Sequence, residues 1–338
     1  MIQYVIRRIL WSIPVLFLLT LTVFLLMRAI PGGPFDFSGD KKIPDVVRQN
    51  LERRYHLDEP TSTQFVRYLV GDFVDTRDIR DFGKDGLLRG DLGLSLRQRG
   101  RTVNEILGDS FPISAQLGVL SMMLAIFIGI PAGILAALKQ NSWIDYSSTF
   151  VAVLGVSIPN MVMGPLLIWA FALKLNWFPV ATWGARPPFT LGFLPAPTAA
   201  FWSHAVLPTL ALGTALSASI ARLTRASLLQ VIREDYIRTA RAKGLRETVV
   251  VMRHALKNSL IPVATVLGPL FAAVVTGTFI VELIFGIPGM GKHFVTSIGN
   301  RDYTLIQGAT LLYALLLVVA NLAVDITYAW LDPRIRYD

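Results

Sequence analysis

Apolar residues along this 338-residue chain fall into six long runs, which polar loops separate. The runs cover residues 9–27, 115–138, 149–173, 205–220, 261–285 and 305–330. A helix needs about 20 mostly apolar residues to cross the hydrocarbon core of a bilayer, and most of these runs reach that length. The pattern therefore predicts an all-α integral membrane protein with about six transmembrane helices, the fourth continuing as helix beyond residue 220.

The composition supports a membrane protein. Hydrophobic residues make up 53% of the chain and charged residues only 16%, against about 25% charged residues in a typical soluble domain. The net charge of +9 favours a membrane surface over nucleic acid, because the basic residues gather at the predicted membrane ends. The chain has no cysteine, which excludes a disulfide framework, a thiol nucleophile and a cysteine-ligated metal.

Charge in the loops predicts the orientation. Residues 220–260 hold nine Lys and Arg against three acids, so this loop should be cytoplasmic. Residues 30–111 are near neutral and should lie outside, and six spans then place both termini inside. The first run is longer than the apolar core of a signal peptide, which predicts a retained helix.

These patterns divide the chain into three parts. They are an N-terminal transmembrane helix at 1–29, an extracytoplasmic loop region at 30–111, and a core of about five transmembrane helices at 112–338. The core contains a cytoplasmic coupling loop at 231–260.

The long outer region contains two stretches with helical spacing. Apolar residues recur at Val47, Leu51 and Tyr55, and again at Phe65, Leu69 and Phe73, which predicts two short amphipathic helices. Residues 74–86 are charge-rich and have no assigned role. A second outer loop, at 175–204, carries aromatic residues that suit either an interfacial belt or the substrate entrance; these are Trp177, Phe178, Trp183 and Phe189.

The basic cytoplasmic loop contains a candidate docking helix. Ile237, Ala240 and Gly244 share one helical face, and such a small face allows close docking into a groove on another protein. Gly244 also suits the left-handed end of a helix. A positive-inside anchor or an anionic-lipid patch would also explain the arginines, but not the small residues beside them.

The run Tyr236–Leu245 resembles the EAA loop of binding-protein-dependent ABC importer permeases. The general pattern begins Glu-Ala-Ala, whereas this chain has Arg238-Thr239-Ala240, and Pro262 lies farther from Gly244 than usual. Both departures are similar to the peptide/nickel branch, which includes dipeptide and oligopeptide transport. Segments 6–10, 31–34, 88–95, 285–291 and 328–336 also resemble that branch, so the likeness covers nearly the whole chain.

The resemblance implies which residues couple this chain to an ATPase. They are Tyr236, Ile237, Arg238, Thr239, Ala240, Arg241, Ala242, Lys243, Gly244 and Leu245. It also implies a function as a transport subunit without its own nucleotide site, forming half of the pathway for peptides or a similar small solute. The sequence leaves dipeptides, oligopeptides, nickel chelates and oligosaccharides open.

The same resemblance implies the setting of the chain. The expected partners are a homologous second permease, two cytoplasmic ATPase subunits, an extracytoplasmic solute-binding protein and membrane lipid, with no nucleic acid. No cofactor is expected on this chain, and ATP and Mg²⁺ are expected on the ATPases. The location would be a bacterial or archaeal plasma (inner) membrane, crossed several times.

A second candidate site lies at the end of the fifth run. Glu282 is an acid in a membrane segment, which is costly and often functional; a structural role at the interface is an equal alternative. The possible pathway or outer gate comprises Glu282, Gly286, Pro288, Gly289 and Gly291. Residues 286–293 also approach the phosphate-loop pattern, but His293 replaces the hydroxyl residue that would hold Mg²⁺.

Two other classes of protein fit less well. A self-contained secondary transporter or channel is the main alternative. It would need ion-coupling charges deep in the spans, and the sequence shows no deep acid–base pair. An intramembrane enzyme would need a nucleophile–base pair or a metal constellation. The four histidines are not spaced as metal ligands, so no catalytic or metal residue is predicted.

Overall fold

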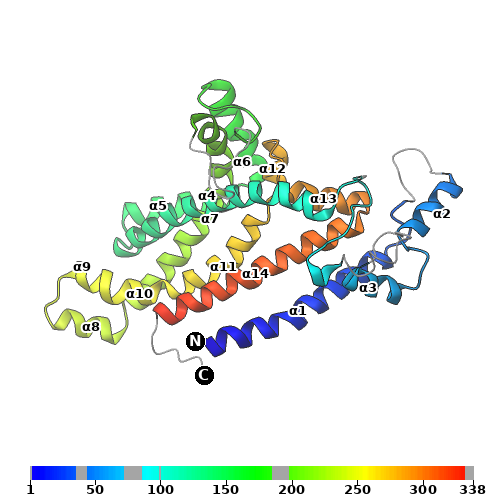
Figure 1. The fold of residues 1–338 in the computed structure, drawn as a ribbon. Helices are drawn as coiled ribbons and strands as arrows, with labels where there is room; N and C mark the ends of the chain where they lie inside the picture. The colour runs from blue at the N-terminus through cyan, green and yellow to red at the C-terminus, as the bar shows by residue number, and fades with distance from the viewer. Residues whose placement is uncertain (1, 36–43, 72–85, 99, 185–197, 332–338) are drawn as a thin grey trace. The chain divides into compact units, whose positions relative to one another are not determined.

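The fold is described from a computed structural model covering residues 2–35, 44–71, 86–98, 100–184 and 198–331 (Figure 1). The chain divides into two compact units. Unit 1 contains Met1–Ile6, Pro112–Gly289 and Leu316–Asp338, and unit 2 contains Arg7–Phe111 and Met290–Leu315.

Five apolar helical spans are long enough to cross a membrane. They comprise α1 (Ile2–Ala29), α4 (Val103–Leu138), α7 (Ala199–Val231), α11 (Ile261–Val275) together with α12 (Phe279–Ile284), and α14 (Tyr303–Leu331). A bent pair of shorter helices supplies a sixth span if it is counted as one. The described residues therefore confirm an all-α membrane protein with about six transmembrane helices.

The third apolar run differs from the single helix predicted over 149–173. It consists of α5 (Trp143–Ser157) and α6 (Asn160–Leu167), the latter continuing into the π-helical η3 (Ile168–Lys174), and the two halves meet at 102°. Pro159 causes the break, because a proline disfavours helical backbone in the residue before it. Ile158 accordingly has φ −85° and ψ 113°.

Two other spans extend or interrupt their predicted runs. Helix α4 begins twelve residues before the predicted start at residue 115. The fifth run is interrupted between α11 and α12, where Gly277 takes φ +103°. Helix α7 continues to Val231, which confirms that the fourth helix extends beyond residue 220.

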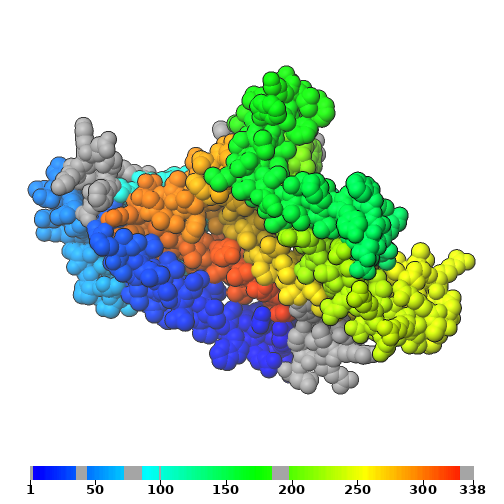
Figure 2. Space-filling model, turned by 180° about the vertical axis from the view of Figure 1, so that it is seen from behind, coloured from blue at the N-terminus to red at the C-terminus, as the bar shows by residue number. Residues whose placement is uncertain are grey.

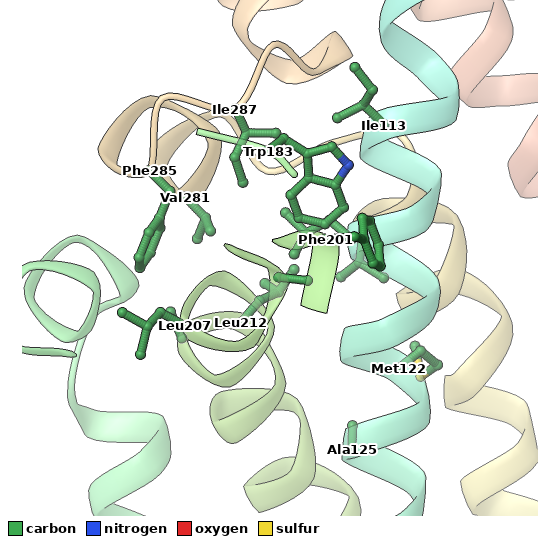
Figure 3. Close-up of a cluster of buried hydrophobic side chains, with 14 of the residues drawn as sticks. Ile113, Met122, Ala125, Trp183, Phe201, Leu207, Leu212, Val281, Phe285 and Ile287 are labelled. Atoms are coloured by element: carbon green, nitrogen blue, oxygen red, sulfur yellow. The ribbon is translucent and has the colours of Figure 1, made fainter. Parts of the chain in front are cut away.

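The core of unit 1 is an apolar cluster between α4, α7 and the segment that follows α12 (Figure 3). Trp183 belongs to this cluster, with its ring edge-on to Phe201 at 5.5 Å between centroids. Its indole N–H donates to Gln116 Oε1 at 3.2 Å. The interfacial-belt interpretation is therefore wrong for Trp183, although Trp177 is 63% exposed. Phe189 lies outside the described residues.

Helices α4 and α7 approach each other at glycines. A Cβ added to Gly129 would lie 2.7 Å from the carbonyl oxygen of Ser217, and one added to Gly133 would lie 2.5 Å from that of Ala221. Small residues let helix backbones approach closely in membranes, where apolar burial supplies little drive for association. These two glycines therefore set the spacing of the two helices.

Unit 2 contains the two short helices predicted for the outer region. They are α2 (Asp45–Arg54) and α3 (Thr61–Val70). Phe65 of α3 packs edge-on against Phe17 and Phe24 of α1, with ring centroids 5.8 and 4.9 Å apart. Most of the charge-rich segment 74–86 lies outside the described residues.

A second set of contacts joins the remaining elements of unit 2. These are η2 (Leu87–Arg89), the loop that follows it, α13 (Met290–Asn300) and the first turns of α14. The buried Asp302 accepts hydrogen bonds from the Ser95 hydroxyl and from the Leu96 amide, the latter at 3.0 Å. An apolar cluster of Val103, Ile106, Leu107, Met290, Leu305 and Ala309 packs beside them.

Candidate functional site: the α8 segment and the Glu282 turn

The segment that follows α7 folds into a short helix, and the chain then returns through three further helical pieces. After Val231 the chain turns into α8 (Asp235–Ala242), then α9 (Glu247–Val249), the π-helical η4 (Val250–Ala255) and α10 (Leu256–Ser259). Helix α8 lies alongside the returning chain (Figure 1). Figure 2 shows this segment, in yellow, at the surface of the molecule. The run predicted as a coupling helix is therefore helical through Ala242.

The apolar face of α8 packs against the chain itself. Ile237 is fully buried and Ala240 is buried. They form a cluster with Ala137 of α4, Leu228 of α7, and Val250 and Ala255 of η4. The expectation that the Ile237 and Ala240 stripe enters a groove on another protein is therefore wrong for this structure, because that stripe already has neighbours.

Gly244 has the backbone conformation that its position predicts. Its φ is +76°, and its amide donates to the carbonyl of Arg241 at 2.9 Å, so the residue ends α8 in the left-handed region. A Cβ added there would meet no heavy atom within 4 Å. Glycine is therefore favoured here by backbone conformation, and the space around it lies open.

Two side-chain contacts hold α8 to the returning chain. Arg241 donates to both carboxylate oxygens of Glu247, at 2.6 and 3.1 Å. These hydrogen bonds hold the pKa of Glu247 below its usual range. Asn258 Nδ2 donates to the Tyr236 hydroxyl at 2.8 Å. The two contacts join α8 to α9 and to α10, so the segment is connected beyond its apolar cluster.

The exposed face of α8 and its end are polar and mainly basic. The exposed residues of the predicted coupling run are Tyr236, Arg238, Thr239, Arg241, Ala242, Lys243, Gly244 and Leu245. A groove of about 560 Å³ lies beside the start of the helix. Its lining includes Gln230, Arg233 and Asp235. Arg238 pairs with Asp235 at 3.3 Å, and the groove lining also contains Glu234, so a partner that binds here would meet a mainly basic surface next to a groove of mixed charge.

The Glu282 turn is a separate polar site in unit 1. Glu282 on α12 is fully buried, and the Ser114 hydroxyl of α4 donates to its Oε1 at 2.7 Å. The Ile287 amide donates to the carbonyl oxygen of Glu282 at 2.8 Å. The acid thus joins Ser114 of α4 to the turn after α12.

Glycines shape that turn. Gly286 takes φ +61°. A Cβ on Gly289 would lie 2.5 Å from Ser114 Oγ and 2.6 Å from Glu282 Oε1, so only glycine fits there without displacing the pair. Pro288 lies between them in the turn, whereas Gly291 belongs to α13 in unit 2. Four of the five predicted gate residues therefore lie in or beside one turn.

One buried ion pair of unit 1 escaped the sequence analysis. Arg225 of α7 pairs with Asp145 of α5, 80 residues earlier. Neither residue stands in a recognisable motif, and nothing in the local pattern pairs them. Among the residues that the structure describes, no three His, Asp or Glu side chains are grouped to hold a metal ion.

Comparison with known proteins identifies the family. The family model described as the binding-protein-dependent transport system inner membrane component matches residues 129–337. A companion model for the N-terminal part of such membrane components matches residues 1–118. The chain belongs to this permease family.

Curated relatives of the permease match over essentially their full length. The oligopeptide transport system permease protein OppB of Salmonella typhimurium is 41% identical, and the match covers 100% of both chains. The dipeptide transport system permease protein DppB of Bacillus subtilis is 40% identical over 99% of this chain and 98% of its own. The glutathione transport system permease protein GsiC of Escherichia coli is 39% identical over 100% of both.

A solved structure shares the fold of the permease. The MetNI methionine ABC transporter, in an inward-facing conformation, contains a chain that matches with a TM-score of 0.53 and 15% identity. The match covers 68% of this permease and 97% of that chain. Together with the family, this fold makes the permease a membrane-embedded transport subunit of an ABC importer, which depends on ATPase and binding-protein partners for its work.

Proposed function

We propose that this permease forms half of the membrane pathway of an ATP-driven importer of peptides. The full-length likeness to dipeptide, oligopeptide and glutathione permeases supports this solute class. A homologous second permease would supply the other half. Two cytoplasmic ATPases would bind ATP and Mg²⁺, and an extracytoplasmic binding protein would deliver the peptide.

The observation that carries the proposal is the exposed basic surface of α8. This surface and the adjoining groove are the part of the segment left open, since Ile237 and Ala240 are buried against α7 and η4. We assign the ATPase contact to Arg238, Lys243 and their exposed neighbours, in place of the apolar stripe. Charged rims steer and orient partners, and acidic groups on the ATPase would complement these cations.

The internal contacts of the segment give a route for movement. A displacement of α8 by the ATPase would act on α7 through Leu228 and on α4 through Ala137. The Arg241–Glu247 and Tyr236–Asn258 contacts would move α9 and α10 together with α8. The ATPase cycle would thus reach the spans that line the pathway, as a packed segment transmits displacement better than a loose loop.

The Glu282 turn is the proposed outer gate. Ser114, Glu282 and Gly289 interlock at the end of α12, so a shift of α4 against this turn would have to separate the hydroxyl from the carboxylate. This assignment places Glu282 at the outer end of its span, with residues 30–111 outside and both termini and α8 in the cytoplasm. The basic excess of 220–260 supports that orientation.

The test is uptake by the assembled importer. The permease, its companion permease, both ATPases and the binding protein are reconstituted in proteoliposomes, and ATP-dependent uptake of labelled di- and oligopeptides is measured. Arg238→Glu with Lys243→Glu should reduce ATPase recovery and uptake. Arg53→Glu, the same change at an exposed position of α2, should leave ATPase recovery unchanged. Peptide uptake by this chain without any ATPase would overturn the proposal.

A further inference from the structure

Unit 2 contains a small cavity, mainly apolar but with several polar side chains in its walls, that plays no part in the proposed coupling or gate. Its volume is about 50 Å³, and its walls come from α1, α3, the loop after α2, the loop at 94–96 and the first turns of α14. A water needs roughly 10–15 Å³ on such a measure, so the cavity has room for a small polyatomic group. The polar side chains in its walls indicate which group that is.

Arg28 supplies a positive charge to the cavity. Its Nε–H donates to Gln64 Oε1 at 2.7 Å, and its guanidinium carbon lies 3.3 Å from the centre of the Phe24 ring. Within the part of the chain that the structure describes, no carboxylate pairs with Arg28. A half-buried guanidinium without an acid partner is costly, and a bound anion would compensate its charge.

Two carboxylates lie close to the cavity, and both already have partners: Asp302 accepts from the Leu96 amide and the Thr304 hydroxyl, and Glu59 is paired with Arg67. Glu59 accepts two hydrogen bonds from Arg67, at 2.8 and 2.9 Å, and His56 Nδ1 lies 3.2 Å from its Oε1. Gln64 is fixed in turn, because its Nε2 donates to the carbonyls of Leu57 and Glu59. The charge of Arg28 therefore remains uncompensated while that of Arg67 is balanced.

Two buried nitrogens on the cavity wall complete the site. Gln307 is 4% exposed, and its Nε2 has no hydrogen-bond partner among the described residues. His56 Nε2 likewise has none there. A buried amide without a partner is destabilising, and an oxyanion oxygen would accept from it. His56 Nε2 donates to an anion when the ring is protonated and accepts from a phosphate hydroxyl when it is neutral.

From these contacts we infer that the cavity binds a phosphate group, held by the Arg28 guanidinium and the Gln307 amide. Arginine and amide N–H groups form strong hydrogen bonds to phosphate oxygens. Arg28 is the penultimate residue of the first span, a position at the depth of phospholipid headgroups. The phosphate can come from a headgroup or from free inorganic phosphate, and the experiment distinguishes the two.

The test uses the purified importer complex and three variants. Gln307→Glu keeps the shape of the side chain but replaces the donor with a negative charge, and Gln307→Leu removes the donor without adding charge. Gln49→Glu makes the same charge change at an exposed position of α2 and serves as the matched control. Recovery of the intact complex from the membrane shows that each variant folds.

Binding is measured in two arms. In the first, the complex is reconstituted in nanodiscs of phosphatidylglycerol or of an uncharged, phosphate-free glycolipid, and retained lipid is measured by native mass spectrometry after extraction. In the second, lipid-depleted complex is titrated with inorganic phosphate and its thermal stability is followed. We expect phosphate-dependent binding in one arm or both, with Gln307→Glu weakening it by more than about tenfold, as like-charge repulsion replaces a charge-assisted hydrogen bond.

The results distinguish a lipid phosphate, free phosphate and the absence of a site. Gln49→Glu should bind as the natural protein does, and Gln307→Leu should fall between it and Gln307→Glu. Binding in the first arm alone would identify the lipid as the source, and binding in the second would identify free phosphate. If neither arm shows binding, or if folded Gln307→Glu and Gln307→Leu bind as tightly as Gln49→Glu, the site does not exist.

Discussion

Arg225 donates to both carboxylate oxygens of Asp145, at 2.5 and 2.7 Å, and so ties the start of α5 to α7. The side chain of Asp145 is only 2% exposed, and that of Arg225 is 29% exposed. The amide of Asn141 donates to the same carboxylate at 3.0 Å. This fork of hydrogen bonds fixes the first half of the broken span against the helix that leads to α8.

Breaking this pair from the arginine side should destabilise the permease. Arg225→Leu would leave the buried carboxylate of Asp145 without its cation. We expect a loss of about 2–4 kcal/mol, somewhat below the usual cost for a fully buried pair because Arg225 retains some exposure. Thermal unfolding of the purified complex in detergent measures the change.

The exposed Arg222, on the same helix, provides the comparison for this experiment. Arg222→Leu removes the same charge without exposing a buried acid, so it should leave the melting temperature nearly unchanged. Arg225→Lys should fall between the two variants, because lysine keeps the charge but loses the planar fork. Equal stability of Arg225→Leu and Arg222→Leu would show that the ion pair contributes nothing.

The close approach of α4 and α7 leads to a second prediction. Gly133→Val would place methyl groups against the carbonyl of Ala221 and the Cβ of Thr224, which lie 2.5 and 2.6 Å from the added Cβ. Neither the α7 backbone nor a β-branched carbon can move aside easily. Overpacking of this kind costs about 1–3 kcal/mol, and complex yield and thermal stability should both fall.

Gly108 lies on the same helix but has open space around it. Gly108→Ala should be neutral or stabilise by up to about 1 kcal/mol through helix propensity alone. A Gly133→Val permease with unchanged stability would mean that α4 and α7 are free to separate, contrary to the tight packing described for unit 1.

The sequence predicts the spans well because length and apolarity alone decide which helices cross a membrane. It predicts α2 and α3 because Val47, Leu51, Phe65 and Leu69 recur with the period of a helix. The break at Pro159 carried a usable signal, as proline restricts the residue before it. The Asp145–Arg225 pair carried none, since its partners lie far apart in sequence and only the packing of α5 on α7 brings them together.

In the candidate site, too, the sequence predicts local features but not long-range contacts. Local pattern places α8 and the left-handed Gly244, because both depend on neighbouring residues. It does not reveal which face of α8 is free, since a stripe such as Ile237 and Ala240 suits an internal cluster as well as a partner. Likewise, the sequence singles out Glu282 as an acid in a membrane segment, but its partner Ser114 is 168 residues away and becomes visible only in the fold.

The Glu282 turn provides a third prediction. Gly289→Ala would force its Cβ against the Ser114–Glu282 pair. The pair should separate or the turn should shift, so we expect reduced peptide uptake with the complex still assembled and able to bind ATP. Gly299→Ala, in an open position of α13, is the control. Full uptake by the Gly289→Ala complex would remove the gate assignment from this turn.

The end of α8 provides the last prediction, which separates backbone conformation from contact with the ATPase. Gly244→Leu and Gly244→Asn both add a side chain to open space, but asparagine tolerates the left-handed conformation much better than leucine does. If the exposed surface binds the ATPase, Gly244→Leu should lower ATPase recovery strongly, whereas Gly244→Asn should retain a larger share of it. Membrane abundance of the permease should remain normal for both.

Arg241→Ala extends this comparison to the ion pair that joins α8 to α9. Both Arg241 and Glu247 are substantially exposed, so the loss should change stability by no more than about 1 kcal/mol. ATPase recovery should fall less than with Gly244→Leu, because α8 remains held by its apolar cluster and by Tyr236. Recovery is measured by copurification of the ATPases with the tagged permease, and uptake is measured in the same preparations. For the Gly244→Leu variant, normal ATPase recovery and normal uptake would show that the end of α8 does not contact the ATPase. The coupling surface would then lie along the groove beside Gln230 and Arg233.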